Sequence, residues 1–176
     1  MRGLAVVLGL LSLLVVPGVL TAQDFNALST LAKQGRPQLA RVETEADRGG
    51  THVASGTPVA GGEPFPLSGP HWPRATPSGF YQEPQPKGEL IHALEHGQVV
   101  VYYEAPGFKG LSVLKRWTGQ FAGPWSGLIA VPHTGLGDDV VLTGWRRRLR
   151  LDAFDEAALA AFMDAYMGRG PENPVR

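Results

Sequence analysis

The fold is decided by residues 98–131, which read QVVVYYEAPGFKGLSVLKRWTGQFAGPWSGLIAV. The Val/Tyr-rich residues 98–104 are typical of a buried strand, and residues 128–131 predict a second, shorter one. Between them, after a Pro-Gly turn, apolar side chains follow the 3-3-4 spacing of an amphipathic helix: Leu111, Leu114, Trp117 and Phe121. Because a strand–helix–strand unit favours a right-handed parallel crossover, the two strands are expected to pair in parallel.

Further elements flank this unit on both sides. Residues 89–96 predict a short helix stopped by Gly97, and residues 24–33 and 39–44 predict a helix and a strand. Residues 140–145 predict a strand, antiparallel to its neighbour, which residues 146–151 continue with alternating faces. Asp155 is expected to cap a last helix that ends at Tyr166.

These elements predict an α+β domain with a small mixed β-sheet, packed helices and a βαββα-like core, in an order similar to thioredoxin-like cores. A long segment, residues 49–88, has no regular period, and Gly and Pro supply 16 of its 40 residues. It nevertheless contains His52, Phe65, His71, Trp72, Phe80 and Tyr81. Disordered linkers are poor in aromatic residues, so an ordered loop packed on the domain is expected.

The composition excludes several classes of function. The chain has 176 residues, with 16 basic and 16 acidic side chains and no net charge, so nucleic-acid binding is not expected. It has no cysteine, which excludes disulfides, thiolate metal ligands and a cysteine nucleophile. Nothing in the sequence indicates a nucleotide, haem or flavin, and the oligomeric state is left open.

The N-terminus is typical of an export signal. A positive start at Met1-Arg2 precedes an apolar run to Val16, and small residues stand before Gln23. We expect residues 1–22 to be a cleaved signal peptide and the protein to be periplasmic or extracellular. An uncleaved membrane anchor is the alternative, and only then is membrane contact expected. The predicted divisions are 1–22, an N-terminal segment 23–48, a single domain 49–172, and a tail 173–176.

Histidines supply the candidate site. On a helix, His92 and His96 at i and i+4 share a face and are close enough to hold one metal ion, whereas on a strand they would lie too far apart. We expect His71 and His52, from the irregular loop, as further ligands. Glu95 and Ser68 are expected to support the ligands from outside the coordination sphere. The alternative is that these histidines only pack the loop onto the domain. His133 is expected to be solvated.

Two enzymatic interpretations are weaker. Residues 92–96 fit the H-x-x-E-H order of inverted zinc peptidases, but Gly97 stops the helix immediately and a strand follows. Ser68 near His71 suggests a serine hydrolase, but the chain has no G-x-S-x-G motif. No reaction is therefore predicted.

Several of these motifs together resemble a bacterial family of exported or membrane-anchored proteins, the domain of unknown function family numbered 3105. The resemblance covers roughly residues 49–172. It rests on His52-Val53, Ser68-Gly69-Pro70-His71, Gly79-Phe80-Tyr81, the block from His92 to Gly97, Thr143-Gly144-Trp145 and Pro171-Glu172. Two positions depart from the family pattern: Phe65 to Gly69 replaces its Pro-Pro-Thr-Ser-Gly turn, and Arg146 stands where Gly usually follows the tryptophan. The resemblance implies the domain limits and export, and it implies no activity.

Two hypotheses follow for the function. The first is an exported domain that binds a divalent transition metal through imidazoles, which suit Zn²⁺ or Cu²⁺ better than Mg²⁺ or Ca²⁺. The second is a non-enzymatic interaction module of the cell envelope, with a protein partner, structural histidines and no metal. Converging imidazole nitrogens favour the first hypothesis, and rings that point to separate backbone carbonyls favour the second.

Overall fold

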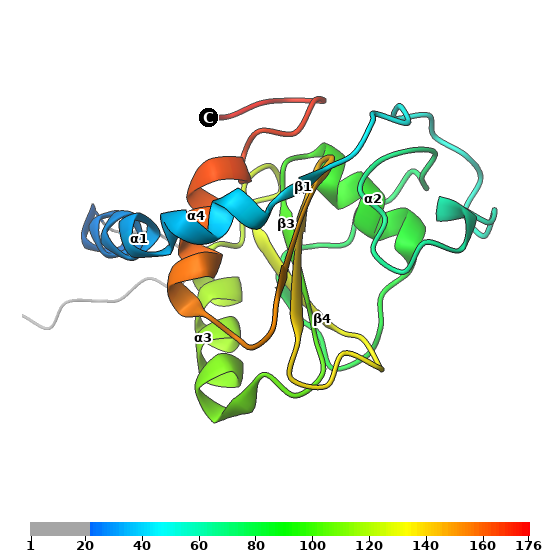
Figure 1. Ribbon diagram of the computed structural model, residues 1–176. Coiled ribbons are helices and arrows are strands. Elements are labelled where there is room, and N and C mark those ends of the chain that lie inside the picture. Colours follow the sequence, from blue (N-terminus) through cyan, green and yellow to red (C-terminus); the bar gives the residue numbers. More distant parts are fainter. Residues whose placement is uncertain (1–21) are drawn as a thin grey trace, which may run out of the picture.

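The computed structural model describes residues 22–176, so the predicted signal lies, apart from Ala22, outside the described residues. The described part forms four α-helices and a six-stranded sheet (Figure 1). The helices are α1 (Ala22–Gly35), α2 (Lys87–Glu95), α3 (Gly107–Gln120) and α4 (Glu156–Tyr166). The strands are β1 (Glu43–Thr44), β2 (Gly79–Phe80), β3 (Val99–Tyr103), β4 (Leu128–Pro132), β5 (Val140–Gly144) and β6 (Arg147–Leu151). Two 3-10 helices span Arg36–Arg41 and Ala60–Gly62.

The sheet is mixed, with the strand order β1-β6-β5-β3-β4-β2. β3 and β4 pair in parallel, with Val99 opposite Leu128, as the strand–helix–strand unit predicts. β5 lies antiparallel to β3 on the other side. The α+β class with a mixed sheet is thereby confirmed, and the core order β3, α3, β4, β5, β6, α4 has one strand more than the predicted βαββα order.

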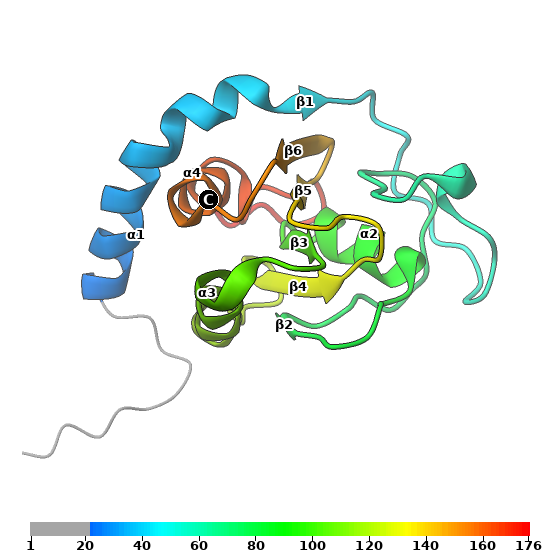
Figure 2. The ribbon, with the colours of Figure 1, turned by 60° about the horizontal axis from the view of Figure 1, so that its bottom comes forward.

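Each face of the sheet packs against its own hydrophobic core. Successive residues of a strand point to opposite faces, so Val99 and Val101 join one core while Val100 and Tyr102 join the other. Helices α3 and α4 cover the first face, α1 packs on the outside of α4, and α2 with the long loop covers the second face (Figures 1 and 2). Because β3 is buried on both sides, its sequence is continuously apolar.

The predicted strand over residues 140–151 is wrong in one respect. The chain reverses at Trp145-Arg146, and β6 folds back antiparallel on β5. Arg146 has a φ of 63°, the left-handed conformation that a tight hairpin turn requires. Alternation continues on both sides of this turn, so the sequence pattern alone did not reveal the break.

The predicted strand at residues 39–44 is also largely wrong. Pro37 stands in the first turn of a 3-10 helix over Arg36–Arg41, and only Glu43–Thr44 is left to pair with β6. Figure 2 shows the segment from α1 to β1 passing around the sheet edge. Within residues 22–176, no helix combines the length and apolar character needed to cross a membrane.

The long loop is ordered, as predicted. Its end also forms β2, which pairs in parallel with β4 and closes one edge of the sheet. An isolated parallel bridge joins His52 to His71 within the loop. The loop is therefore an ordered layer on the second face of the sheet, and it places His52 and His71 against α2.

Candidate metal centre

Helix α2 presents His92 and His96 on one side. The helix ends at Glu95, but His96 keeps helical backbone angles of φ −65° and ψ −16°. The two imidazole centroids are therefore only 4.5 Å apart. Gly97, with φ at 93°, then turns the chain into β3. The helical geometry on which shared metal binding depended is thus present.

The loop brings His52 and His71 against the same helix. The Val53 N–H donates to the His71 carbonyl at 2.8 Å, and the His71 N–H donates to the Thr51 carbonyl at 3.0 Å. This pairing fixes the two residues side by side, with ring centroids 4.8 Å apart. Both rings also lie 4.8 Å from the ring of His92.

Backbone carbonyls orient two of the rings. His71 Nδ1 lies 2.9 Å from the Gly69 carbonyl, and His92 Nδ1 lies 2.7 Å from the Trp72 carbonyl. Because a carbonyl oxygen only accepts hydrogen bonds, these contacts assign the proton to Nδ1 in both rings. The Nε2 atom of each neutral ring then carries a free lone pair, which is the usual arrangement in a metal-ligating histidine.

The surroundings of His92 lower the pKa of its imidazole. Burial lowers its pKa, the hydrogen bond to Trp72 opposes that shift, and the neighbouring His96, His71 and His52 lower it further. A protonated imidazole cannot bind a metal ion. The crowding of histidines therefore favours the form of His92 that can act as a ligand.

Glu95 faces the Nε2 atom of His71. Its Oε2 lies 3.0 Å from that nitrogen, and the His71 side chain is completely buried. The contact lacks hydrogen-bond geometry, and Nε2 has no hydrogen-bond partner among residues 22–176. With the proton on Nδ1, the lone pair of His71 Nε2 and the Oε2 atom of Glu95 point toward each other. A cation bound between them would stabilise this arrangement.

The potential ligands form two overlapping sets. The inner set is His52, His71, His92 and Glu95, and the outer set is His92, His96 and Glu172. Within each set the ligand atoms lie within 4.8 Å of one another, wider than the roughly 3.4 Å between two ligands of one tetrahedral ion at about 2.0–2.1 Å, so the side chains would draw together around an ion. In the outer set, Glu172 Oε2 lies 3.0 Å from His96 Nε2 and 3.9 Å from His92 Nε2.

Comparison with known proteins gives one match. Residues 52–176 match a family described as protein of unknown function, DUF3105. The chain belongs to the DUF3105 family. Neither the curated proteins nor the solved structures gave a match. The DUF3105 region begins at His52 and extends beyond Glu172, so it contains every residue of both sets.

Sequence reasoning did not single out Glu172 as a candidate ligand, although Pro171-Glu172 is one of the motifs that carry the family resemblance. The residues after α4 return to the end of α2, where the Gly168 N–H donates to the Gly97 carbonyl at 2.8 Å. A Cβ on Gly170 would collide with the Glu95 carbonyl, so glycine permits this close approach. Trp125 was also missed, and its ring centroid lies 4.1 Å from that of His96.

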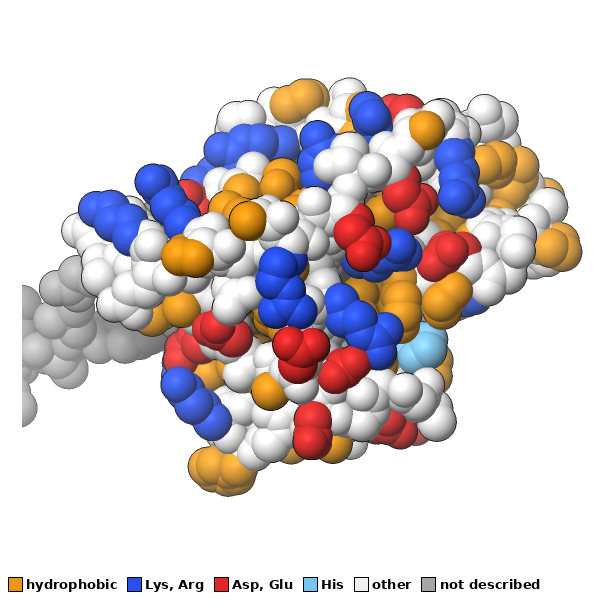
Figure 3. All heavy atoms as spheres, in the orientation of Figure 1, with side chains coloured by type: hydrophobic (Ala, Val, Ile, Leu, Met, Phe, Trp, Pro, Cys, Tyr) orange, Lys and Arg blue, Asp and Glu red, His pale blue; other side chains and the backbone are white. Residues whose placement is uncertain are grey.

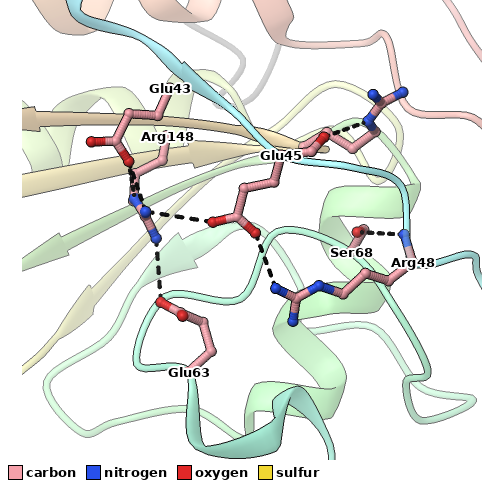
Figure 4. Close-up of polar contacts among 7 residues, drawn as sticks. Glu43, Glu45, Arg48, Glu63, Ser68 and Arg148 are labelled. Atoms are coloured by element: carbon pink, nitrogen blue, oxygen red, sulfur yellow. Dashed lines mark hydrogen bonds and ion pairs between the residues drawn. The ribbon is translucent and has the colours of Figure 1, made fainter.

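An arginine clasp holds the entry to the loop (Figure 4). We define this arginine clasp as Arg148 of β6 with the three glutamates that surround it. The Arg148 guanidinium lies 2.7 Å from Glu43, 3.4 Å from Glu45 and 3.2 Å from Glu63. These ion pairs connect β1 and the loop to β6, and Glu43 and Glu45 precede His52 in the sequence. Elsewhere on the face of Figure 1, acidic and basic side chains are interspersed (Figure 3).

Two further residues singled out from the sequence, Ser68 and His133, do not belong to either set of potential ligands. Ser68 is buried and its Oγ accepts a hydrogen bond from the Arg48 N–H at 3.1 Å, and its role in supporting the ligands stays a prediction. His133 lies outside both sets, half-buried, with its ring centroid 4.6 Å from that of Phe65.

Proposed function

We propose that this DUF3105 domain binds one divalent transition-metal ion, Zn²⁺ or Cu²⁺, at the inner set. One observation carries the proposal: three imidazoles and a carboxylate meet from two separate segments, the loop and α2, within 4.8 Å. Three nitrogens and one oxygen make a four-coordinate site for a borderline metal ion. Mg²⁺ and Ca²⁺ prefer all-oxygen sites and fit this set poorly.

The competing function of these histidines is packing alone. His71 and His92 do point to separate carbonyls, as packing histidines would. Each imidazole has two nitrogens, however, and these bonds use only Nδ1. Packing explains the 3.0 Å approach of the Glu95 carboxylate to the buried Nε2 only through an ion pair with a protonated His71, because this nitrogen is not positioned to donate a hydrogen bond to it. Metal binding accounts for both nitrogens of His71.

The structure allows variants that remove only the ligand nitrogen. The amide nitrogen of asparagine occupies the place of Nδ1, so His71→Asn and His92→Asn can keep the bonds to the Gly69 and Trp72 carbonyls while Nε2 is lost. His133→Asn is a matched control, since His133 belongs to neither set. The proteins are produced without a histidine tag and purified without chelator.

Metal content by mass spectrometry, after equilibration with Zn²⁺ or Cu²⁺, tests the proposal. The parent and His133→Asn should retain about one ion per chain, and the other two variants should lose it while staying folded by circular dichroism. Bound metal should also raise the melting temperature of the parent. A parent that takes up neither metal would overturn the proposal and favour the metal-free interaction module.

We further propose that the protein acts in the cell envelope. The support is the N-terminal sequence, whose charged start, apolar run and small residues resemble a secretory signal. Outside the cytoplasm, a histidine and carboxylate site has the advantage that it needs no reduced thiol. Fractionation of cells that produce the full chain, with sizing of the mature protein, tests the location and the cleavage together.

A further inference from the structure

His92 is the one residue common to both ligand sets of the described chain. Its Nδ1 is bound to the Trp72 carbonyl at 2.7 Å, so its ring offers a single lone pair, at Nε2. One lone pair binds one ion. The inner and outer sets therefore cannot both be complete at the same time.

The two sets differ in their access to solvent. In the inner set the side chains of His71 and Glu95 are 0% and 12% exposed. In the outer set those of His96 and Glu172 are 16% and 42% exposed. Glu172 also belongs to the segment after α4, which contacts the site through a few backbone hydrogen bonds such as Glu172 N–H to the Glu95 carbonyl at 3.4 Å. Each set has one exposed residue, His52 in the inner set and Glu172 in the outer set, but His96 of the outer set is more exposed than His71 or Glu95 of the inner set.

We propose that the outer set is a transfer position for the metal of the inner set, with His92 as the ligand that stays bound throughout. An incoming ion binds His96, Glu172 and His92, and then exchanges the first two for His52, His71 and Glu95. Only coordination bonds break and form, and the oxidation state of the metal does not change. The site therefore exchanges its metal, as a carrier of Zn²⁺ or Cu²⁺ does. This inference rests on the proposed function.

The neighbouring groups favour such a shift. Glu95 and His96 are consecutive residues on α2 yet face different partners, His71 and Glu172. Each position thus has one carboxylate to neutralise the incoming charge and at least one imidazole besides His92. The first and the final position of the ion therefore each include a carboxylate ligand.

The experiment measures both stoichiometry and exchange rate. Titration of the parent with Cu²⁺ or Zn²⁺ gives the number of ions bound, and stopped-flow transfer of the bound ion to a chelator gives the rate. The variants are His96→Asn and Glu172→Gln in the outer set and His52→Asn in the inner set. We expect about one ion per chain in the parent, and unchanged stoichiometry but roughly tenfold slower transfer in both outer variants.

The other outcomes are distinct. Two ions bound at once by the parent would overturn the inference, because His92 cannot be shared. Loss of the ion from the outer variants as complete as from His71→Asn would show a single site, which also overturns it. Unchanged transfer in the outer variants with slower transfer in His52→Asn would place the entry at the exposed His52 instead. A parent without metal would overturn the proposed function itself.

Discussion

The Oε2 atom of Glu95 lies 3.0 Å from the Nε2 atom of the completely buried His71, in an orientation that does not make a hydrogen bond. Glu95 comes from helix α2 and His71 from the irregular loop. This contact therefore connects α2 to the long loop, the two parts that cover the second face of the sheet. It also gives the carboxylate a direct place in the inner set.

Glu95→Gln should weaken binding of Zn²⁺ or Cu²⁺ about ten- to a hundredfold, because the amide keeps the shape but loses the negative charge. Isothermal titration measures the affinity. Glu89→Gln is the control on the same helix, since Glu89 contacts Arg74 at 3.9 Å and lies outside both sets. Equal affinity of Glu95→Gln and the parent would place the carboxylate outside the coordination sphere.

Gly97→Ala should destabilise the fold by more than Gly135→Ala. Both glycines have positive φ, 93° and 91°, so both substitutions carry a backbone cost of about 1 kcal/mol. At Gly97 the new Cβ would lie 2.7 Å from the Gly170 nitrogen, whereas at Gly135 it meets open space. Urea unfolding measures the difference. Equal losses in the two variants would mean that the segment around Gly170 moves aside at no cost.

Loss of the arginine clasp should loosen the entry to the loop. Arg148→Met leaves three glutamates without their shared cation, and we expect a loss of about 1–2 kcal/mol, because the group is only partly exposed. Hydrogen exchange should rise at residues 43–48 and 60–69. Arg150→Met is the control, since it breaks one exposed pair with Asp139. Equal protection in both variants would show that the clasp adds nothing.

Tryptophan fluorescence should report metal binding. The Trp125 ring lies 4.1 Å from His96, so Cu²⁺ held by the site should quench its emission. We expect Trp125→Phe to lose the larger part of the quenching and Trp145→Phe to keep it. A Trp125→Phe protein that is quenched as strongly as the parent would contradict the close contact between the Trp125 ring and the metal-binding residues.

The stability of the fold should fall at alkaline pH. Burial raises the pKa of Tyr102, Tyr103 and Tyr81 above the usual value of 10.0. Because the unfolded chain then loses its tyrosine protons first, stability is fully present below pH 10 and declines as the pH rises beyond it. Urea midpoints across the alkaline range measure the decline, and Tyr102→Phe should reduce its slope. A decline of the same slope in Tyr102→Phe would exclude this tyrosine as a cause.

Much of the fold was predictable because its core is local and periodic. The strand–helix–strand unit over residues 98–131 follows from apolar spacing alone, and its parallel pairing follows from the handedness of crossovers. The turn at Trp145-Arg146 was missed because alternation does not change across it. The short strand β2 was missed because two residues are too few to show a pattern.

The site was predictable where its residues are close in sequence or chemically distinctive. His92 and His96 follow from helical spacing, and His52 and His71 from the search for further imidazoles. Glu172 could not be predicted as a partner of His96, because their contact depends on how the chain after α4 returns to α2. An acidic residue near a chain end has no feature in the sequence that distinguishes it from a solvated one.

The carbonyl of Trp72 has a consequence for how such sites can be recognised in other sequences. It orients the imidazole of His92, and with it the candidate ligand atom Nε2, through the main chain, and every amino acid carries the same carbonyl oxygen. Position 72 can therefore change its side chain in the course of evolution without altering the direction of the imidazole. A search pattern written in side-chain identities will find the ligands and overlook the atoms that orient them.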